Sequence, residues 1–110
     1  DIVIGGHCGI PFGQKLADRA WLNAGVTGLP ANDGNPCGWY LLIMPAERGI
    51  EARWQRLDYD HQAAFRSMQA AGLNDYALSL KHGLWPSMDV LPAVEQSQQG
   101  LALNLAPLKL

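Results

Sequence analysis

The first residues of the chain limit its possible folds more than any other segment. Ile2-Val3-Ile4 is a run of β-branched residues, which is typical of a strand buried on both faces inside a sheet. Two glycines follow, allow the backbone to turn, and place His7 at the carboxyl end of the strand. Ligands of α/β proteins bind at that edge, and neutral imidazole binds zinc, manganese, iron and nickel well. The segment predicts an α/β fold and makes His7 a candidate ligand, although a single histidine in a glycine-rich loop is, taken alone, more often an ordinary loop histidine.

Three further segments are predicted to be strands. Arg19–Asn23 is short, and residues 37–44 are apolar on both faces, which favours a second buried strand. Ile50–Leu57 begins with alternating apolar and polar residues, so we expect a half-exposed strand paired with residues 37–44. Dense turn signals separate these strands, above all in residues 32–36, Asn-Asp-Gly-Asn-Pro.

The hydrophobic period changes to that of a helix after residue 58. Asp60 is a suitable N-cap for a helix that ends at Gly72, and Asn74 for a second helix that ends at Gly83. The first carries an apolar stripe of alanine, phenylalanine and methionine side chains. Residues 84–92 are predicted to be an ordered loop, and residues 101–110 alternate loosely like an edge strand. We therefore divide the chain into a sheet segment, residues 1–58, and a helical extension with a tail, residues 59–110.

Composition removes several classes of protein. Apolar residues make up 48% and charged residues 16% of the chain, as in a globular protein. The formal net charge of −2 offers no basic stripe, so nucleic acid is an unlikely partner. No apolar run is long enough for a membrane span, and no signal peptide is visible. Cys8 and Cys37 are too few for a disulfide scaffold, and we expect a cytoplasmic protein. Because Asp1 leads straight into an apolar strand, we also expect a piece of a longer chain.

Two motifs, in the same order along the chain, resemble the C-terminal part of the calcineurin-like metallophosphoesterase family. There, strand-Gly-His-x-His-x-Pro is followed by Asn-Pro-Gly-Ser-x-Gly-x-Pro and a strand. Here Gly6-His7-Cys8-Gly9-Ile10-Pro11 is followed by Asn23-Ala24-Gly25-Val26-Thr27-Gly28-Leu29-Pro30 and then by Trp39-Tyr40-Leu41. The resemblance covers about residues 1–44, with a weaker likeness in the tail. It implies an α/β fold that is the C-terminal part of a four-layer α/β/β/α sandwich, with mixed sheet strands followed by two helices.

The resemblance also implies one corner of a metal site. In this family two divalent ions, which here could be Mn, Fe, Zn or Ni, activate a water and stabilise phosphoryl oxygens. His7 matches the first histidine of the motif and is the expected metal ligand, in a loop that includes Gly6. Gly9 takes the place of the second histidine, which leaves open whether one or two ions bind. Cys8 is a possible replacement ligand by proximity, but a packed thiol is the more favoured interpretation.

Asn23 matches the asparagine of the second motif. It would orient the histidine loop without touching the metal, or it would only stabilise the turn before Gly25. His61 falls in the first turn of the first predicted helix, and His82 in the last turn of the second. We expect both to have structural or surface roles. Large aromatic residues such as Trp54 and Trp85 could line a substrate opening, but they favour a place in the core.

The expected function therefore belongs to a longer parent chain, of which these 110 residues would be one part. The family's other motifs, which hold the remaining ligands and the catalytic histidine, are not in this sequence, so no catalytic residue is assigned here and the 110 residues alone should be inactive. The parent would hydrolyse a phosphomonoester or phosphodiester of a small molecule, and this segment would pack against the rest of it. The alternative is a non-catalytic binding or scaffold protein on the same fold, which Gly9 favours. A nuclease is disfavoured by the lack of basic residues.

Overall fold

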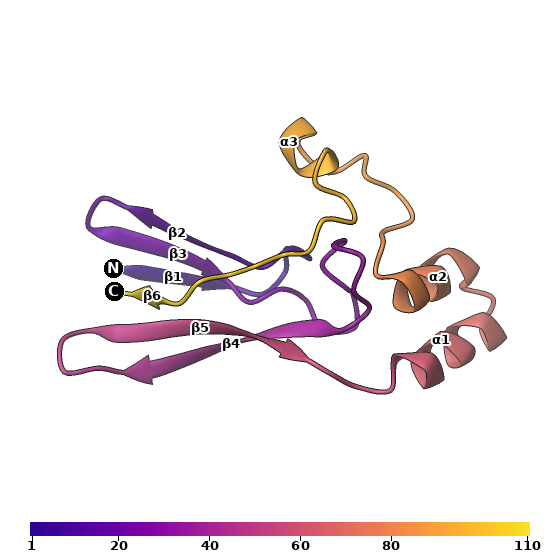
Figure 1. The fold of residues 1–110 in the computed structure, drawn as a ribbon, viewed down its shortest axis with the longest axis horizontal. Helices are drawn as coiled ribbons and strands as arrows, with labels where there is room; N and C mark the ends of the chain where they lie inside the picture. The colour runs from indigo at the N-terminus through magenta and orange to yellow at the C-terminus, as the bar shows by residue number, and fades with distance from the viewer.

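The computed structural model describes residues 1–110, which form two three-stranded sheets and three short helices (Figure 1). The first sheet has the order β1-β3-β2, with β1 (Ile2–Gly5), β2 (Phe12–Leu16) and β3 (Arg19–Asn23). β1 pairs with β3 in parallel and β2 pairs with β3 antiparallel, so this sheet is mixed as predicted. The β3 prediction is confirmed residue for residue. β2 was not predicted, because Phe-Gly-Gln-Lys-Leu has neither β-branched residues nor regular alternation.

The second sheet is antiparallel and has the order β4-β5-β6. β4 (Gly38–Pro45) and β5 (Ile50–Leu57) pair over their full lengths, as the sequence predicted. Ala52 and Trp54 are buried while Arg53 and Gln55 are exposed, so the predicted alternation of β5 is confirmed. β6 (Leu108–Lys109) has only two residues, and the rest of the tail that was expected to form an edge strand is irregular.

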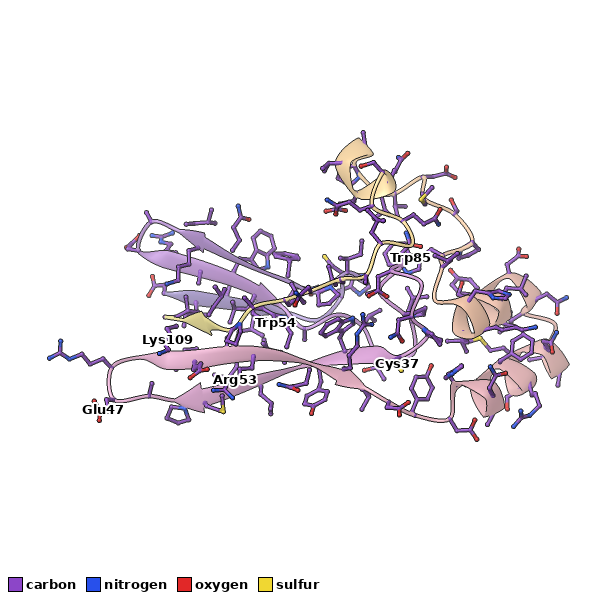
Figure 2. The ribbon with its side chains drawn as sticks, viewed as in Figure 1. Cys37, Glu47, Arg53, Trp54, Trp85 and Lys109 are labelled. Carbon is purple, nitrogen blue, oxygen red and sulfur yellow. The ribbon has the colours of Figure 1, made fainter.

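The core lies between the two sheets. It is built on Leu22 of β3 and on Ala52 and Trp54 of β5, all of them buried. Figure 2 shows Trp54 between the two layers of strands. Partly buried residues of β4 and of the C-terminal tail pack around this cluster: Trp39, Leu41, Leu105, Leu108 and Leu110. The tail therefore crosses back over the core before it pairs with β5 (Figure 1).

Two helices pack on each other beyond the end of β5 (Figure 1). α1 (His61–Ala70) begins as predicted, because Oδ1 of Asp60 accepts a hydrogen bond of 2.9 Å from the backbone N–H of Ala63. α2 (Asn74–His82) ends as predicted at Gly83, which is left-handed with φ 72°. The N-cap prediction for Asn74 is wrong. Leu73 is the N-cap and makes no side-chain hydrogen bond.

The helices bury little surface. α2 buries Ala77, Ser79 and Leu80, whereas no residue of α1 is buried, so its apolar stripe is covered only in part. α3 (Ala93–Gln96) is a single turn near the start of the tail. None of the three helices has the length and hydrophobicity that crossing a membrane requires.

Two predictions of buried strands are wrong. β1 is at the edge of its sheet, and Val3 and Ile4 are 60% and 55% exposed. β4 is also an edge strand, with Tyr40, Leu42 and Ile43 exposed on it. The accessible surface is 7104 Å², against about 6000 Å² for a typical folded chain of this mass. The radius of gyration is 15.2 Å, against about 13 Å for 110 residues in one compact domain. The fold is a small mixed α/β unit with apolar strand faces open to solvent.

Candidate functional site

The predicted metal ligand lies at the end of β1. β1 ends at Gly5, and the loop that begins at Gly6 leads to β2. Gly5 pairs with Asn23, the last residue of the parallel strand β3, so the carboxyl ends of both strands lie side by side. His7 is exposed in this loop, and its ring makes no hydrogen bond or ion pair within the chain. The imidazole is thus available to a ligand at the edge where α/β sheets bind them.

Asn23 fixes the shape of this loop. Its side chain is buried, with the residue 1% exposed, and Nδ2 donates hydrogen bonds of 2.8 Å to the carbonyl of Cys8 and 2.9 Å to that of Ile10. The backbone carbonyl of Asn23 accepts a hydrogen bond of 2.7 Å from Nε1 of Trp54, which ties the loop to the core. Of the two roles considered for Asn23, the contact with the histidine loop is present. A role in orienting a metal ligand stays a prediction.

Gly9 is covered by the indole ring of Trp85. A β-carbon built on Gly9 would lie 2.3 Å from Cζ2 and 2.8 Å from Cη2 of that ring, so only glycine fits. The ring is held in place twice. The backbone N–H of Trp85 donates a hydrogen bond of 2.7 Å to Oδ1 of Asn32, and Nε1 donates one of 2.6 Å to the carbonyl of Pro30. The space over Gly9 is therefore filled by an aromatic ring from a segment far along the chain.

The remaining candidate ligands do not gather around His7. No group of three or more histidine, cysteine, aspartate or glutamate side chains lies close enough together to hold a metal ion. Cys8 is exposed, so its interpretation as a packed thiol is wrong. Nδ1 of His61 is 2.9 Å from the carbonyl of Leu80, which gives that histidine the structural role that the sequence favoured. This chain by itself brings one imidazole to the site.

A cavity of about 720 Å³ opens beside His7. One side is the histidine loop, and another is formed by Tyr76 of α2 and by residues of the segment that connects α2 with α3. Trp85 belongs to this segment (Figure 2). Glu95 of α3 contributes the only carboxylate, and no lysine or arginine lines the cavity. Sequence reasoning missed Tyr76 and Glu95. The one available signal was the Trp-Pro pair in a segment predicted to be an ordered loop.

A polar cluster with a structural role lies where β4 begins and β5 ends. The Asp33 carboxylate is buried, forms an ion pair with the Arg56 guanidinium, and accepts a hydrogen bond of 3.1 Å from the backbone N–H of Leu103 in the tail. The guanidinium also lies over the Trp39 ring, 4.1 Å from its centroid. The cluster connects the turn after β3, the second sheet and the tail, and so supports the segment that carries Asn32.

Cys37 lies next to this cluster and is a poor candidate for chemistry. Burial raises the pKa of its thiol above the ordinary value, and its hydrogen bond to the Asp58 carboxylate, 3.6 Å from Sγ to Oδ1, raises it further. The thiol therefore stays protonated at neutral pH, whereas nucleophiles and metal ligands are thiolates.

Gly9→Ala should lower the free energy of unfolding by about 1–3 kcal/mol, because the new methyl group overlaps the Trp85 ring. Gly6→Ala, in the same loop, is the matched control. The nearest atom to its new methyl group is the carbonyl oxygen of Gly25 at 3.8 Å, so we expect a change below about 1 kcal/mol. Urea unfolding followed by circular dichroism measures both. Equal midpoints for the two variants would show that the indole does not pack on Gly9.

No family model, no curated protein and no solved structure matches this chain. The likeness to metallophosphoesterases therefore depends on the motif residues around His7 and Asn23 alone.

Proposed function

We propose that the chain is the C-terminal part of a metal-dependent phosphoesterase of the calcineurin-like type, which hydrolyses a phosphomonoester or phosphodiester by means of a metal-activated water. The observation that carries the proposal is the position of His7. Its imidazole, without a partner in the chain, stands at the carboxyl end of β1 in a loop that Asn23 of the adjacent parallel strand holds in shape. This is the geometry expected for the first histidine of the family's motif.

Each residue of the corner has a distinct task in this proposal. A divalent ion (Mn, Fe, Zn or Ni) would supply a bound hydroxide and charge for the phosphoryl oxygens. His7 would ligate the ion as neutral imidazole, and the hydrogen bonds from Asn23 to the carbonyls of Cys8 and Ile10 would keep the loop from moving when it does so. Trp85, which fills the place of a second histidine, leaves no room for a ligand at Gly9. Any second ion must therefore take all its ligands from elsewhere.

The exposed apolar surface supports the proposal that further polypeptide completes the fold. Ile2, Val3 and Ile4 are exposed on both faces of β1, and the unpaired edge of that strand is free. A strand of this composition is typical of the interior of a parallel or mixed sheet covered on both sides. Strands and helices of a parent chain would cover it and form the four-layer sandwich. They would also bring the missing ligands, so the 110 residues alone would be inactive and the cytoplasmic enzyme would be the whole parent.

A second function is favoured by one observation. The indole over Gly9 and the single imidazole of the corner suit a scaffold or binding protein on the same fold, in which the metal site has degenerated. The phosphoesterase is preferred because the His7 imidazole is exposed at the carboxyl end of β1 and has no partner within the chain, as suits a metal ligand.

Hydrolysis of bis(p-nitrophenyl) phosphate by the complete parent protein tests the two functions. We expect turnover that requires manganese, disappears with a chelator, and falls about 100-fold or more in His7→Ala, because a direct ligand to the ion is lost. His82→Ala is the control, since His82 is an exposed residue in the last turn of α2. No turnover of diester or monoester with any divalent metal would reject the enzyme in favour of the scaffold.

A further inference from the structure

The residues that line the cavity beside His7 suit an organic group better than a phosphate. We call it the indole groove, after Trp85, and it also includes Leu29, Tyr76, Val90 and Glu95. Its volume of about 720 Å³ lies in the range of small-molecule sites, about 300–1,000 Å³. Eight of its 14 lining residues are hydrophobic, so most of a bound molecule would meet apolar surface.

Trp85 is a rigid part of the groove. Its backbone N–H is bonded to Asn32 and its indole N–H to Pro30, and its ring rests on Gly9. A ring that is fixed before a ligand arrives loses little conformational entropy on binding, which favours affinity for flat apolar groups. The hydrogen bonds of Trp85 are already satisfied within the chain. The ring therefore offers the ligand an apolar surface and no donor.

The charges of the groove limit the ligand further. Glu95 has the only carboxylate that lines it, and no lysine or arginine lies among the lining residues. The Glu95 side chain makes no hydrogen bond and no ion pair within the chain, so its charge is not neutralised. Apart from an ion held by His7 at one end, an anionic group in the groove would meet this charge without a compensating cation, whereas an uncharged group would not be repelled.

We propose that the indole groove binds an uncharged aromatic or similarly flat apolar group, namely the alcohol portion of the phosphoester. This names the substrate class of the proposed phosphoesterase and in that sense rests on it. The phosphoryl group would lie toward His7 at one end of the groove, and the organic group would extend over Trp85 toward α2. Esters whose alcohol carries a second phosphate or a carboxylate should bind more weakly because of Glu95.

Two probes of the same shape test the proposal on the 110-residue chain without metal or phosphate. Naphthalene-2-methanol is neutral and 2-naphthoate is its anionic counterpart. The indole N–H signals in ¹H–¹⁵N NMR spectra report their binding, because each of the four tryptophans gives one signal. We expect naphthalene-2-methanol to shift the Trp85 signal with a Kd on the order of 1 mM, and 2-naphthoate to bind about tenfold more weakly. The signal of Trp39, whose ring lies under the Arg56 guanidinium and does not line the groove, should not move.

Glu95→Gln is the decisive variant, since it keeps the size of the side chain and removes its charge. The tenfold preference for the neutral probe should fall to about twofold or less. Glu47→Gln, in the exposed turn between β4 and β5 at the opposite end of the molecule (Figure 2), should leave the preference unchanged. Val90→Asp replaces an apolar side chain at a residue that is 84% exposed and so should not unfold the chain, but it should weaken the neutral probe severalfold, because binding would take water from the new carboxylate.

Three results would overturn the proposal: no shift of the Trp85 signal at 10 mM naphthalene-2-methanol (about ten times the expected Kd), equal affinity for both probes, or an unchanged preference in Glu95→Gln. Because neither probe contains phosphorus, these results do not depend on hydrolysis. If naphthalene-2-methanol binds but the parent protein is inactive, the proposed phosphoesterase activity is rejected and the binding role of the groove is retained. If the parent protein is active but the groove does not bind the probe, the proposed substrate class is rejected and the phosphoesterase activity is retained.

Discussion

Trp54→Ala is expected to lower the free energy of unfolding by about 3–5 kcal/mol. Trp54 is 6% exposed and is the largest member of the core cluster that it forms with Leu22 and Ala52. Its ring fills the space above Gly13, where an added β-carbon would lie 2.3 Å from Cη2. Its Nε1 donates a hydrogen bond to the carbonyl of Asn23, so the alanine variant leaves a cavity and also a buried carbonyl without its partner.

The loss is large compared with the stability available to this chain. A domain of this size is stable by about 5–15 kcal/mol, and only 16 of the 110 residues are buried, so we expect a value near the lower limit. Urea unfolding monitored by circular dichroism at 222 nm measures the change. Trp21→Ala is the matched control, because Trp21 is 47% exposed on β3, and it should cost about 2 kcal/mol through its partial burial and its contact with the Phe12 ring. Similar losses in the two variants would mean that the core is not centred on Trp54.

Local sequence signals predicted the elements whose partners are near in sequence. The strand Ile50–Leu57 was predicted from alternation, because its two faces meet different surroundings. The start of α1 was predicted from Asp60 and the end of α2 from Gly83, since a cap depends on the few residues around it. Asn74 is not the N-cap, because α2 begins one residue earlier than predicted. Asn74 is its first helical residue, and Leu73 is in the N-cap position.

Burial was predicted less well, because it depends on what covers a face. Ile2-Val3-Ile4 has the composition of an interior strand, yet β1 has a free edge and both faces exposed. No pattern within four residues can show whether a neighbouring strand is present. β2 was missed for a related reason. Its pairing with β3 stabilises a segment whose own propensity for a strand is low.

The same distinction applies to the candidate site. His7 was identified from its place after a strand and glycines, and Asn23 from a second motif whose relation to the first was known only by resemblance. The structure brings them together through the parallel pairing of β1 with β3. The contact of Trp85 with Gly9 could not be predicted, because it depends on how a distant loop folds back, and Asn32 and Pro30 fix that loop only in three dimensions.

Asn23→Asp is the variant with the largest expected effect on the histidine loop. The Asn23 amide donates to two backbone carbonyls, those of Cys8 and Ile10. An ionised carboxylate in the same position has no proton to donate and would face both carbonyl oxygens in a buried site. At pH 7 we expect a loss of about 3–5 kcal/mol in the free energy of unfolding. Asn23→Ala, which removes the donor without adding charge, should lose only about 1–3 kcal/mol.

The dependence on pH separates this explanation from a simple loss of packing. Burial beside two carbonyls should raise the pKa of the new carboxyl group in the folded state above its unfolded value of about 3.9. Between these two pKa values the folded state holds a proton that the unfolded state has lost, so stability falls as pH rises, by up to about 1.4 kcal/mol per pH unit. The difference between Asn23→Asp and the unmodified chain should therefore be smallest near pH 4 and largest at pH 7.

Urea unfolding of both proteins between pH 4 and pH 7 measures that difference directly. Asn104→Asp provides the control, because Asn104 is exposed and its carboxylate would stay hydrated in the folded state, so its difference from the unmodified chain should hardly change with pH. A loss in Asn23→Asp that is the same at every pH would show that the side chain acts only by filling space. A loss that grows with pH would show that the loop carrying His7 depends on two donated hydrogen bonds. In that case any ligand bound by the imidazole depends on them too, because they set the position of the backbone on which His7 is carried.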